Sequence, residues 1–268
     1  MISVWDKNKR YRLARAPACE ATALAERYEA GEDLSHTLSP EELARLCEMK
    51  FPKRRRDWLA GRLAAKRLLV ELLSEQGREM APNEITVLNR KDGSPYAVYA
   101  AGAGEDALPI SLSHAPGGAV AASIVPSAGP NLIGVDAESV MERPESFVSV
   151  FAHPSERAGL DTPQAQTRLW TLKEAVLKLL GLGLSVDLWD VRFLPRPDAS
   201  QAEHCPANTF PKGALCMLDP RCPPVSALLL LELHGRTLSR WDSFGRPEIR
   251  FESNISGHEA VSVAYTGG

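Results

Sequence analysis

The chain has 268 residues, enough for one large domain or two of ordinary size. Hydrophobic residues make up 44% of it and charged residues 24%, which excludes wholesale disorder and indicates a folded globular protein. The formal net charge of −3 gives no overall attraction to nucleic acid or to membranes. Any electrostatic function must therefore come from a local cluster of charges.

The N-terminus, the hydropathy and the cysteines indicate a cytoplasmic protein. The basic residues of MISVWDKNKRYRLARAPA are not followed by an apolar segment, so no secretory signal is expected. The longest apolar stretch, Ala227–Leu231, has the length of a strand rather than of a membrane span. The 5 cysteines are an odd number without C-x-x-C spacing, which indicates neither a disulfide framework nor a zinc site.

In chain order, the first third is predicted to be mainly helical. Ser39-Pro-Glu-Glu combines a cap, a first-turn proline and acidic residues, so a helix is expected to begin there. Leucines at helical spacing predict a longer helix from about Trp58 to about Gln76. Short apolar runs between glycines and prolines then predict strands at Ile85–Leu88, Ile110–Leu112, Ala119–Val125 and Leu132–Val135.

After Glu142 the same order repeats. A helical stretch ends near Gly159, a stronger helix covers Gln166–Leu180, and strands are predicted at Val191–Leu194, Gly213–Leu218, Ala227–Leu233 and Ala260–Tyr265. Helices followed by strands, twice, predict two α+β halves of related design. Pro126–Pro130 is the candidate linker, and residues 195–212 are expected to form a surface loop.

Residues 132–139, LIGVDAES, combine a strand pattern with two carboxylates on one face. Side chains alternate along a strand, so Asp136 and Glu138 share one side, while Ile133, Val135 and Ala137 take the other, apolar side. Two carboxylates on one face repel each other. A strand end in solvent and a cation site both explain this pattern.

The segment WTLKEAVLKLLGLG is predicted to be a helix that places Glu174 and Lys178 on one face. These two residues can form an ordinary surface pair at i,i+4. Lys173 and the glycines that follow also favour a ligand site, because glycines allow a close approach to the backbone. Glu174 beside Asp136 and Glu138 would make a site of hard oxygen donors suited to magnesium, with the lysines holding phosphates.

Two further features have open interpretations. SLSH places Ser113 and His114 at a strand end; neighbours on a strand point to opposite faces, so a Ser–His hydrolase is not expected. The run from Lys50 to Arg67 contains many basic residues and one Asp. It fits a solvated helix face, nucleic acid, ligand phosphates or an acidic protein surface.

Taken in order, five motifs resemble the 4′-phosphopantetheinyl transferases of the long, single-chain, two-half (surfactin-synthetase-activating) type: GRLAAKRLL (61–69), DGSPY (92–96), SLSH (111–114), GVDAES (134–139) and WTLKEAVLKLLGLG (170–183). The pairing of G-[VI]-D-x-E with W-[ST]-x-K-E-A-x-x-K carries the specificity. The resemblance implies an α+β fold of two similar α/β halves with pseudo-twofold symmetry and an active site in the cleft between them. Residues 1–127 would form the half with the basic helix and the coenzyme A phosphate contacts. Residues 128–268 would form the half with the metal carboxylates and the catalytic helix.

The implied reaction transfers 4′-phosphopantetheine from coenzyme A to a serine of an apo acyl or peptidyl carrier protein and releases 3′,5′-ADP. By resemblance, Asp136, Glu138 and Glu174 bind Mg²⁺, which neutralises charge on the pyrophosphate. Glu174 would also take the serine proton, directly or through water. Lys178 would neutralise the transferred phosphate.

The resemblance also implies contacts to coenzyme A itself. Ser113, His114 and Lys173 would contact its phosphates, and Arg56 and Arg62 are candidates for the 3′-phosphate, because guanidinium matches phosphate bidentately. Glu156 lies where the family has a further acidic residue.

The sequence departs from the family in two places. Ser94 stands where the family often has a basic residue, with Lys91 displaced upstream, which affects the expected nucleotide contact there. Ala137 replaces a larger aliphatic residue between the metal carboxylates.

The expected partners are coenzyme A and an apo carrier protein of fatty-acid, polyketide or nonribosomal-peptide synthesis, with no nucleic acid, no membrane and a monomeric state. Two alternatives remain open. One is another metal-dependent phosphate-processing enzyme on the same fold, and the other is a non-catalytic basic binding module.

Overall fold

The computed structural model describes residues 9–101, 104–115, 117–125, 130–195 and 229–266. The chain divides into two compact units, unit 1 (Met1–Ile133) and unit 2 (Gly134–Gly268). Both units mix helices with antiparallel strands, so the expected α+β class is confirmed. The pseudo-twofold relation between the halves, and the division of labour between residues 1–127 and 128–268, stay predictions.

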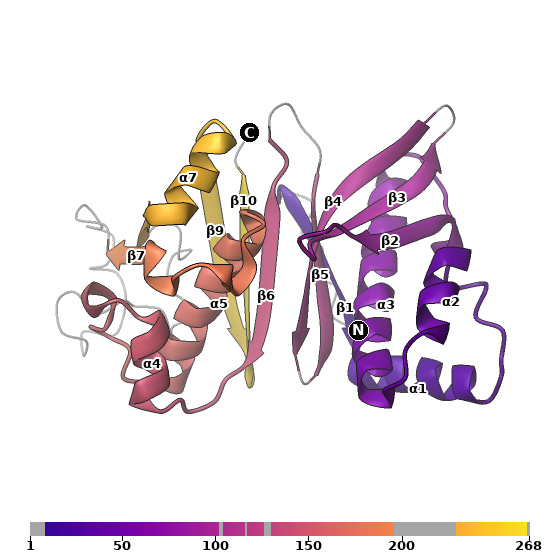
Figure 1. The fold of residues 1–268 in the computed structure, drawn as a ribbon, viewed down its shortest axis with the longest axis horizontal. Coiled ribbons are helices and arrows are strands. Elements are labelled where there is room, and N and C mark those ends of the chain that lie inside the picture. Colours follow the sequence, from indigo (N-terminus) through magenta and orange to yellow (C-terminus); the bar gives the residue numbers. More distant parts are fainter. Residues whose placement is uncertain (1–8, 102–103, 116, 126–129, 196–228, 267–268) are drawn as a thin grey trace. The chain divides into compact units, whose positions relative to one another are not determined.

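Unit 1 is built on one antiparallel sheet. Its elements are β1 (Tyr11–Pro17), α1 (Ala18–Glu29), α2 (Pro40–Cys47), α3 (Pro52–Glu75), η1 (Pro82–Glu84), β2 (Ile85–Asn89), β3 (Pro95–Ala101), β4 (Gly104–Ala115) and β5 (Gly118–Ile124). The strand order is β1-β5-β4-β3-β2. The long helix α3 lies against this sheet, with α1 and α2 beside it (Figure 1). Its buried leucines, among them Leu59, Leu68 and Leu69, form the core with residues of β2 to β5.

A buried carboxylate ties α2 to the rest of unit 1. Glu42 forms a capping box with Ser39, the expected cap, and its side chain accepts from the Ser39 backbone at 3.0 Å. The same carboxylate accepts a hydrogen bond from the Val87 amide at 3.0 Å. It also lies 2.6 Å from Nζ of Lys66 and 3.6 Å from Nε of Arg62, both on α3. One residue of a short helix therefore serves as helix cap and as counterion for two buried cations.

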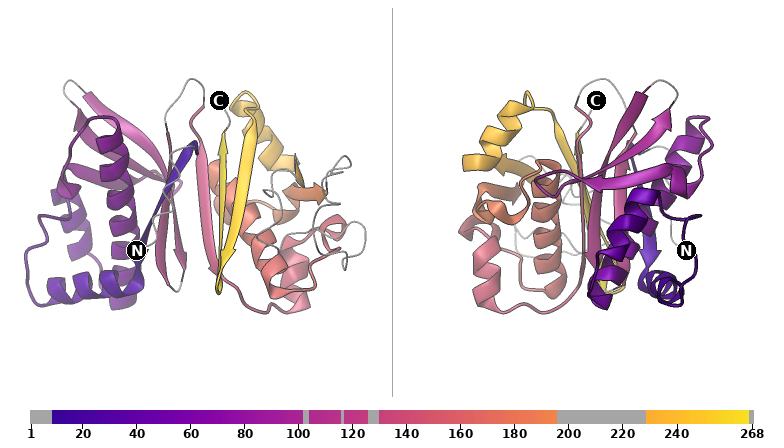
Figure 2. Two further views of the ribbon diagram at one scale, coloured as in Figure 1. Left: turned by 180° about the vertical axis from the view of Figure 1, so that it is seen from behind. Right: turned by 45° about the vertical axis from the view of Figure 1, so that its right-hand side comes forward.

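Unit 2 contains a three-stranded sheet and a separate strand pair. Its elements are β6 (Ile133–Ser139), which begins on the last residue of unit 1, α4 (Glu145–Phe151), η2 (Pro154–Glu156), α5 (Pro163–Leu179), η3 (Gly183–Ser185), η4 (Leu188–Asp190), β7 (Val191–Pro195), β8 (Leu229–Leu233), α7 (Gly235–Ser243), β9 (Ile249–Ser256) and β10 (Glu259–Thr266). The sheet has the order β6-β10-β9, and β7 pairs with β8. Helix α5 packs on this sheet beside β10 (Figure 2).

Several predicted elements are confirmed, and several observed ones were not predicted. The helices expected at Ser39 and at Gln166–Leu180 are present as α2 and α5. Helix α3 begins at Pro52 rather than near Trp58, because proline suits the first turn of a helix. The prediction of a mainly helical first third was wrong in one respect, since the first element of the described residues is strand β1. Strands β3 and β9 and helices α1 and α7 were also missed.

Four predicted segments fall partly or wholly outside the described residues: the linker Pro126–Pro130, the loop 195–212 and the strands Gly213–Leu218 and Ala227–Leu233. In the part of the chain that the structure describes, no helix combines the length and apolarity that a membrane crossing requires.

Gly134 allows α5 to lie directly on β6. A Cβ atom at this position would collide with the carbonyl oxygen of Ala175 and would lie 2.5 Å from the amide nitrogen of Leu179. Both atoms belong to the backbone of α5, which cannot move without displacing the helix. Glycine at this position thus sets the distance between β6 and α5, the two elements that carry the acidic motifs.

Gly134→Ala is expected to lower the free energy of unfolding of unit 2 by about 3 kcal/mol or more, because overpacking against backbone has no cheap relief. Gly117→Ala is the matched control, since a Cβ there meets nothing within 4 Å. Chemical denaturation of both variants measures the difference. Equal stability of the two would show that α5 does not approach β6 this closely.

Candidate active site

Strand β6 and helix α5 bring Asp136, Glu174 and Lys178 together within unit 2. Oδ1 of Asp136 accepts a hydrogen bond from Nζ of Lys178 at 2.6 Å, and Asp136 is 2% exposed. The same Nζ lies 3.8 Å from Oε2 of Glu174, one turn earlier on α5. The face predicted from helical spacing is therefore present, and it meets the first carboxylate of the strand motif.

The remaining side chains continue along the same face of α5. Glu138 accepts a hydrogen bond from the side chain of Trp170, one turn before Glu174. Beyond the end of β6, Nη1 of Arg143 donates to Oγ1 of Thr167 at 2.5 Å, one further turn back. Sequence reasoning missed Arg143, because a single arginine in a loop gives no periodic or spacing signal. Asp136, Glu138 and Glu174 together form an acidic face. Arg143 adds a cation at the end of this face opposite to Lys178.

In the acidic face, burial and mutual repulsion disfavour the ionised forms of Glu138 and Glu174. Burial, and next the charge of Asp136, raise the pKa of Glu174 to about 7, while Lys178 opposes this change. Burial, and next Asp136, also raise the pKa of Glu138. Several carboxylates thus share a poorly hydrated space, where an added positive charge stabilises their ionised forms.

The carboxylate oxygens of the acidic face are suited to a hard divalent cation, although they are not arranged as a complete coordination sphere. Among the described residues, no three His, Cys, Asp or Glu side chains already stand in metal-binding geometry. The ammonium group of Lys178 lies against Asp136 and near Glu174 instead. The oxygens of Asp136, Glu138 and Glu174 are nevertheless the type of ligand that Mg²⁺ prefers, and their mutual repulsion is what a cation would relieve. The residues therefore fit magnesium.

Lys173 lies in a buried ion pair inside unit 2. It is 0% exposed, and its Nζ donates to Oε2 of Glu156 at 2.7 Å and to the carbonyl oxygens of Phe151 and Leu188. Oε1 of Glu156 in turn accepts from the amide of Phe193. The buried ammonium is thus bonded to three oxygens of its own unit, and the phosphate contact expected of it stays a prediction. The ion pair of Lys173 and Glu156 links α5 to the end of α4, to η2, to η4 and to β7.

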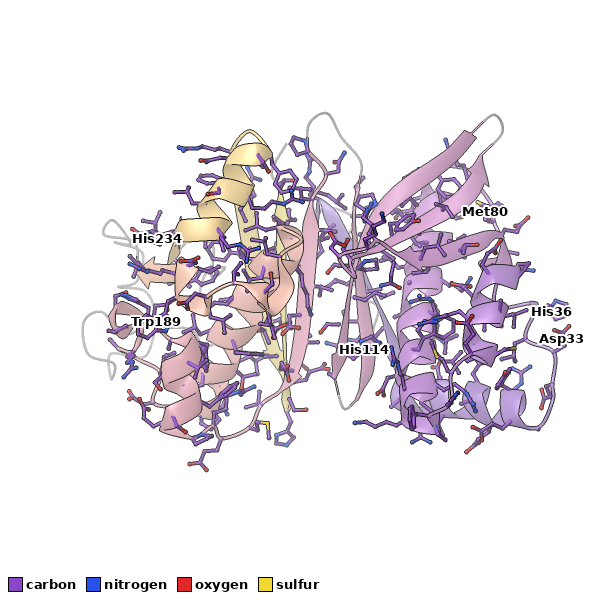
Figure 3. All side chains as sticks on the ribbon, in the orientation of Figure 1. Asp33, His36, Met80, His114, Trp189 and His234 are labelled. Carbon is purple, nitrogen blue, oxygen red and sulfur yellow. The ribbon has the colours of Figure 1, made fainter. Side chains whose placement is uncertain are left out.

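The candidate residues of unit 1 lie on β4 and α3. Ser113 is buried at 4% exposure, whereas His114 is exposed, so the two neighbours take opposite sides as predicted. His114 projects from β4 toward α3, where it lies against Gly61 (Figure 3). Arg56 is exposed near the beginning of α3.

Arg62 is buried among residues of unit 1, and the 3′-phosphate contact expected of it stays a prediction. Its guanidinium lies 4.5 Å from the centre of the Trp58 ring and donates to Oδ1 of Asn89 at 3.2 Å. It is 6% exposed and faces Glu42. Burial lowers the pKa of Arg62 to about 10. Because the guanidinium is surrounded by Trp58, Asn89 and Glu42, little of it is accessible to a phosphate.

The basic run from Lys50 to Arg67 does not form one solvated face. Lys66 is buried beside Glu42, Arg55 pairs with Glu29, and Arg67 pairs with Glu20. The exposed cations gather at the beginning of α3 and just before it: Lys50, Lys53, Arg54 and Arg56. An extended basic surface for nucleic acid is therefore not present along α3.

Arg62→Ala is expected to destabilise unit 1 by about 3 kcal/mol, at the low end for a broken buried ion pair, because Lys66 still accompanies Glu42. Arg54→Ala, at an exposed position of the same helix, should change stability by less than about 0.5 kcal/mol. Urea denaturation compares the two. If the Arg62 variant has normal stability but binds coenzyme A weakly, the expected contact between Arg62 and the 3′-phosphate would be supported.

One comparison with known proteins concerns the segment that contains Asp136, Glu174 and Lys178. Residues 132–216 match the family model ACPS, described as the 4′-phosphopantetheinyl transferase superfamily. Among curated proteins nothing matches the chain. Of the solved structures, 37 chains match. One is holo-[acyl-carrier-protein] synthase (AcpS) of Helicobacter pylori in complex with coenzyme A, which is 18% identical at a TM-score of 0.35, over 51% of this chain and 100% of that chain.

Proposed function

We propose that the protein is a magnesium-dependent phosphopantetheinyl transferase of the long, two-half type. It transfers 4′-phosphopantetheine from coenzyme A to a serine of an apo acyl or peptidyl carrier protein. The observation that carries this proposal is the convergence of Asp136, Glu174 and Lys178, with Glu138 beside them, inside the segment that matches the superfamily. A domain without catalytic activity would have no need to crowd buried carboxylates in this way.

Asp136, Glu138 and Glu174 are the residues that would hold the metal. When bound, Mg²⁺ supplies positive charge to the pyrophosphate of coenzyme A and to the leaving group. The raised pKa values of Glu138 and Glu174 are consistent with a site that is built for added positive charge.

The carboxylate of Glu174 is the proposed general base. It accepts the proton of the carrier serine, whose Oγ then forms a bond to the β-phosphorus of coenzyme A. The bond between that phosphorus and the bridging oxygen breaks, and the electron pair leaves with 3′,5′-ADP. Burial and the charge of Asp136 raise the pKa of Glu174 to about 7, and the positive charge that the site would hold favours the ionised form that accepts the proton. Lys178, one turn further along α5, donates to the transferred phosphate.

Residues of unit 1 are proposed to bind the nucleotide. His114 and Arg56 are exposed and can donate to phosphate oxygens, and Ser113 lies next to His114 on β4. Lys173 and Arg62 are left out of this set, because both are buried in structural pairs. With both units in one chain, the enzyme is proposed to act as a monomer.

The test is incubation with coenzyme A, Mg²⁺ and apo carriers from fatty-acid, polyketide and nonribosomal-peptide synthesis, read by intact mass. A carrier should gain the mass of one phosphopantetheine group, and excess EDTA should prevent the gain. Hydrolysis of coenzyme A without carrier modification would indicate another phosphate-processing enzyme. Salt-dependent nucleic-acid binding without coenzyme A binding would indicate a binding module.

A further inference from the structure

Gly61 occupies a position where glycine is unfavourable. It is buried in the interior of α3, a helix of 24 residues. Glycine is the least favourable residue in a helix interior after proline, and its neighbours Ala60, Ala64 and Ala65 show that this helix uses alanine where it needs small residues. A specific contact should therefore exclude a side chain at position 61.

That contact is the imidazole of His114. A Cβ atom at position 61 would lie 3.0 Å from Nε2 and 3.4 Å from Cε1 of His114, and 3.7 Å from Cδ1 of Leu112. The first distance is tighter than nine in ten real Cβ contacts, so the ring would have to move. The edge of the imidazole carrying Nε2 thus rests on the backbone of α3, while the residue as a whole is exposed at the end of β4.

We infer that Gly61 is a positioning residue, which fixes the imidazole of His114 against α3 so that it can bind a phosphate of coenzyme A. The identity of the ligand rests on the proposed function, whereas the contact between Gly61 and His114 does not. An imidazole has one rotatable bond beyond Cβ, so a flat backbone surface on one side removes most of its freedom. Such preorganisation increases affinity, because less side-chain entropy is lost when the ligand binds.

The contact is tested first by stability, with Gly61→Ala, His114→Ala and the double variant. In the His114→Ala background, Gly61→Ala should raise the melting temperature, because alanine favours the helix and the ring is gone. In the unmodified background the same substitution should raise it less, or lower it, because it displaces the ring. An equal rise in both backgrounds would overturn the inference, since the two residues would then not be in contact.

The positioning role is tested by calorimetric titration of the full-length chain with coenzyme A and Mg²⁺. Gly61→Ala should weaken binding about tenfold in the unmodified background and leave it unchanged in the His114→Ala background. Weakening of equal size in both backgrounds, or none in the unmodified one, would overturn the role even if the stability coupling is present. Failure of the proposed function would give a different set of results from failure of the positioning role. The unmodified chain would then modify no carrier protein, while the stability coupling would persist.

Discussion

Glu174→Gln is expected to lower the turnover of carrier modification by about 10²–10⁴-fold, the usual contribution of a general base. Glutamine keeps the helix and the volume of the side chain but removes the proton acceptor and one negative charge from the acidic face. The affinity for coenzyme A should change much less, because the lost interactions act mainly in the transition state. Steady-state kinetics with a carrier protein and calorimetric titration with coenzyme A separate the two effects.

The control for this substitution is Glu142→Gln, which makes the same chemical change at an exposed position just after β6. It should leave turnover within about twofold of the unmodified enzyme, as expected for an exposed residue outside the acidic face. Normal turnover of the Glu174 variant would instead reduce this residue to a surface partner of Lys178 and would remove the base from the proposed mechanism.

Lys173→Met is expected to lower the free energy of unfolding by about 3–5 kcal/mol, because it leaves the carboxylate of Glu156 buried without its cation. Methionine has a similar length and fills most of the space, so the loss measures the charge rather than a cavity. Adding Glu156→Gln should restore part of the stability, since a buried amide costs less than an unpaired carboxylate. Urea denaturation of the two single variants and the double variant gives the coupling energy.

Arg157→Met is the comparison for a surface pair, because Arg157 lies 3.5 Å from Glu145 with both side chains exposed. Its effect should stay below about 1 kcal/mol. A similarly small effect of Lys173→Met on stability, together with weaker coenzyme A binding, would support the expected contact between Lys173 and a phosphate.

The sequence predicts the acidic face well because two simple periods define it. Alternation along β6 places Asp136 and Glu138 on one side, and spacing of four residues along α5 places Glu174 and Lys178 together. The burial of Lys173, which the sequence did not predict, has a physical cause. Adjacent residues of a helix are about 100° apart, so Lys173 lies with the buried Leu169, Val176 and Leu177 rather than with Glu174.

Arg62 shows why other parts could not be predicted. Arg62, Lys66, Leu69 and Leu73 recur at intervals of four, three and four residues, and all are buried on one side of α3. A basic residue at such a position is read as exposed unless its partner is known. That partner is Glu42, on another helix 20 residues earlier than Arg62 in the chain. Strand β1 was missed for a related reason, since it pairs with β5, far away in the sequence.

The position of Glu42 also determines how unit 1 opens. Helix α2 has 8 residues, too few to be stable by itself, and a helix of this kind would ordinarily detach and exchange its amide protons at little cost. Detaching it here would strip Lys66 and Arg62 of their carboxylate while both remain inside the core. The amides of α2 should therefore exchange as slowly as those of the middle of α3, in one cooperative opening of the unit.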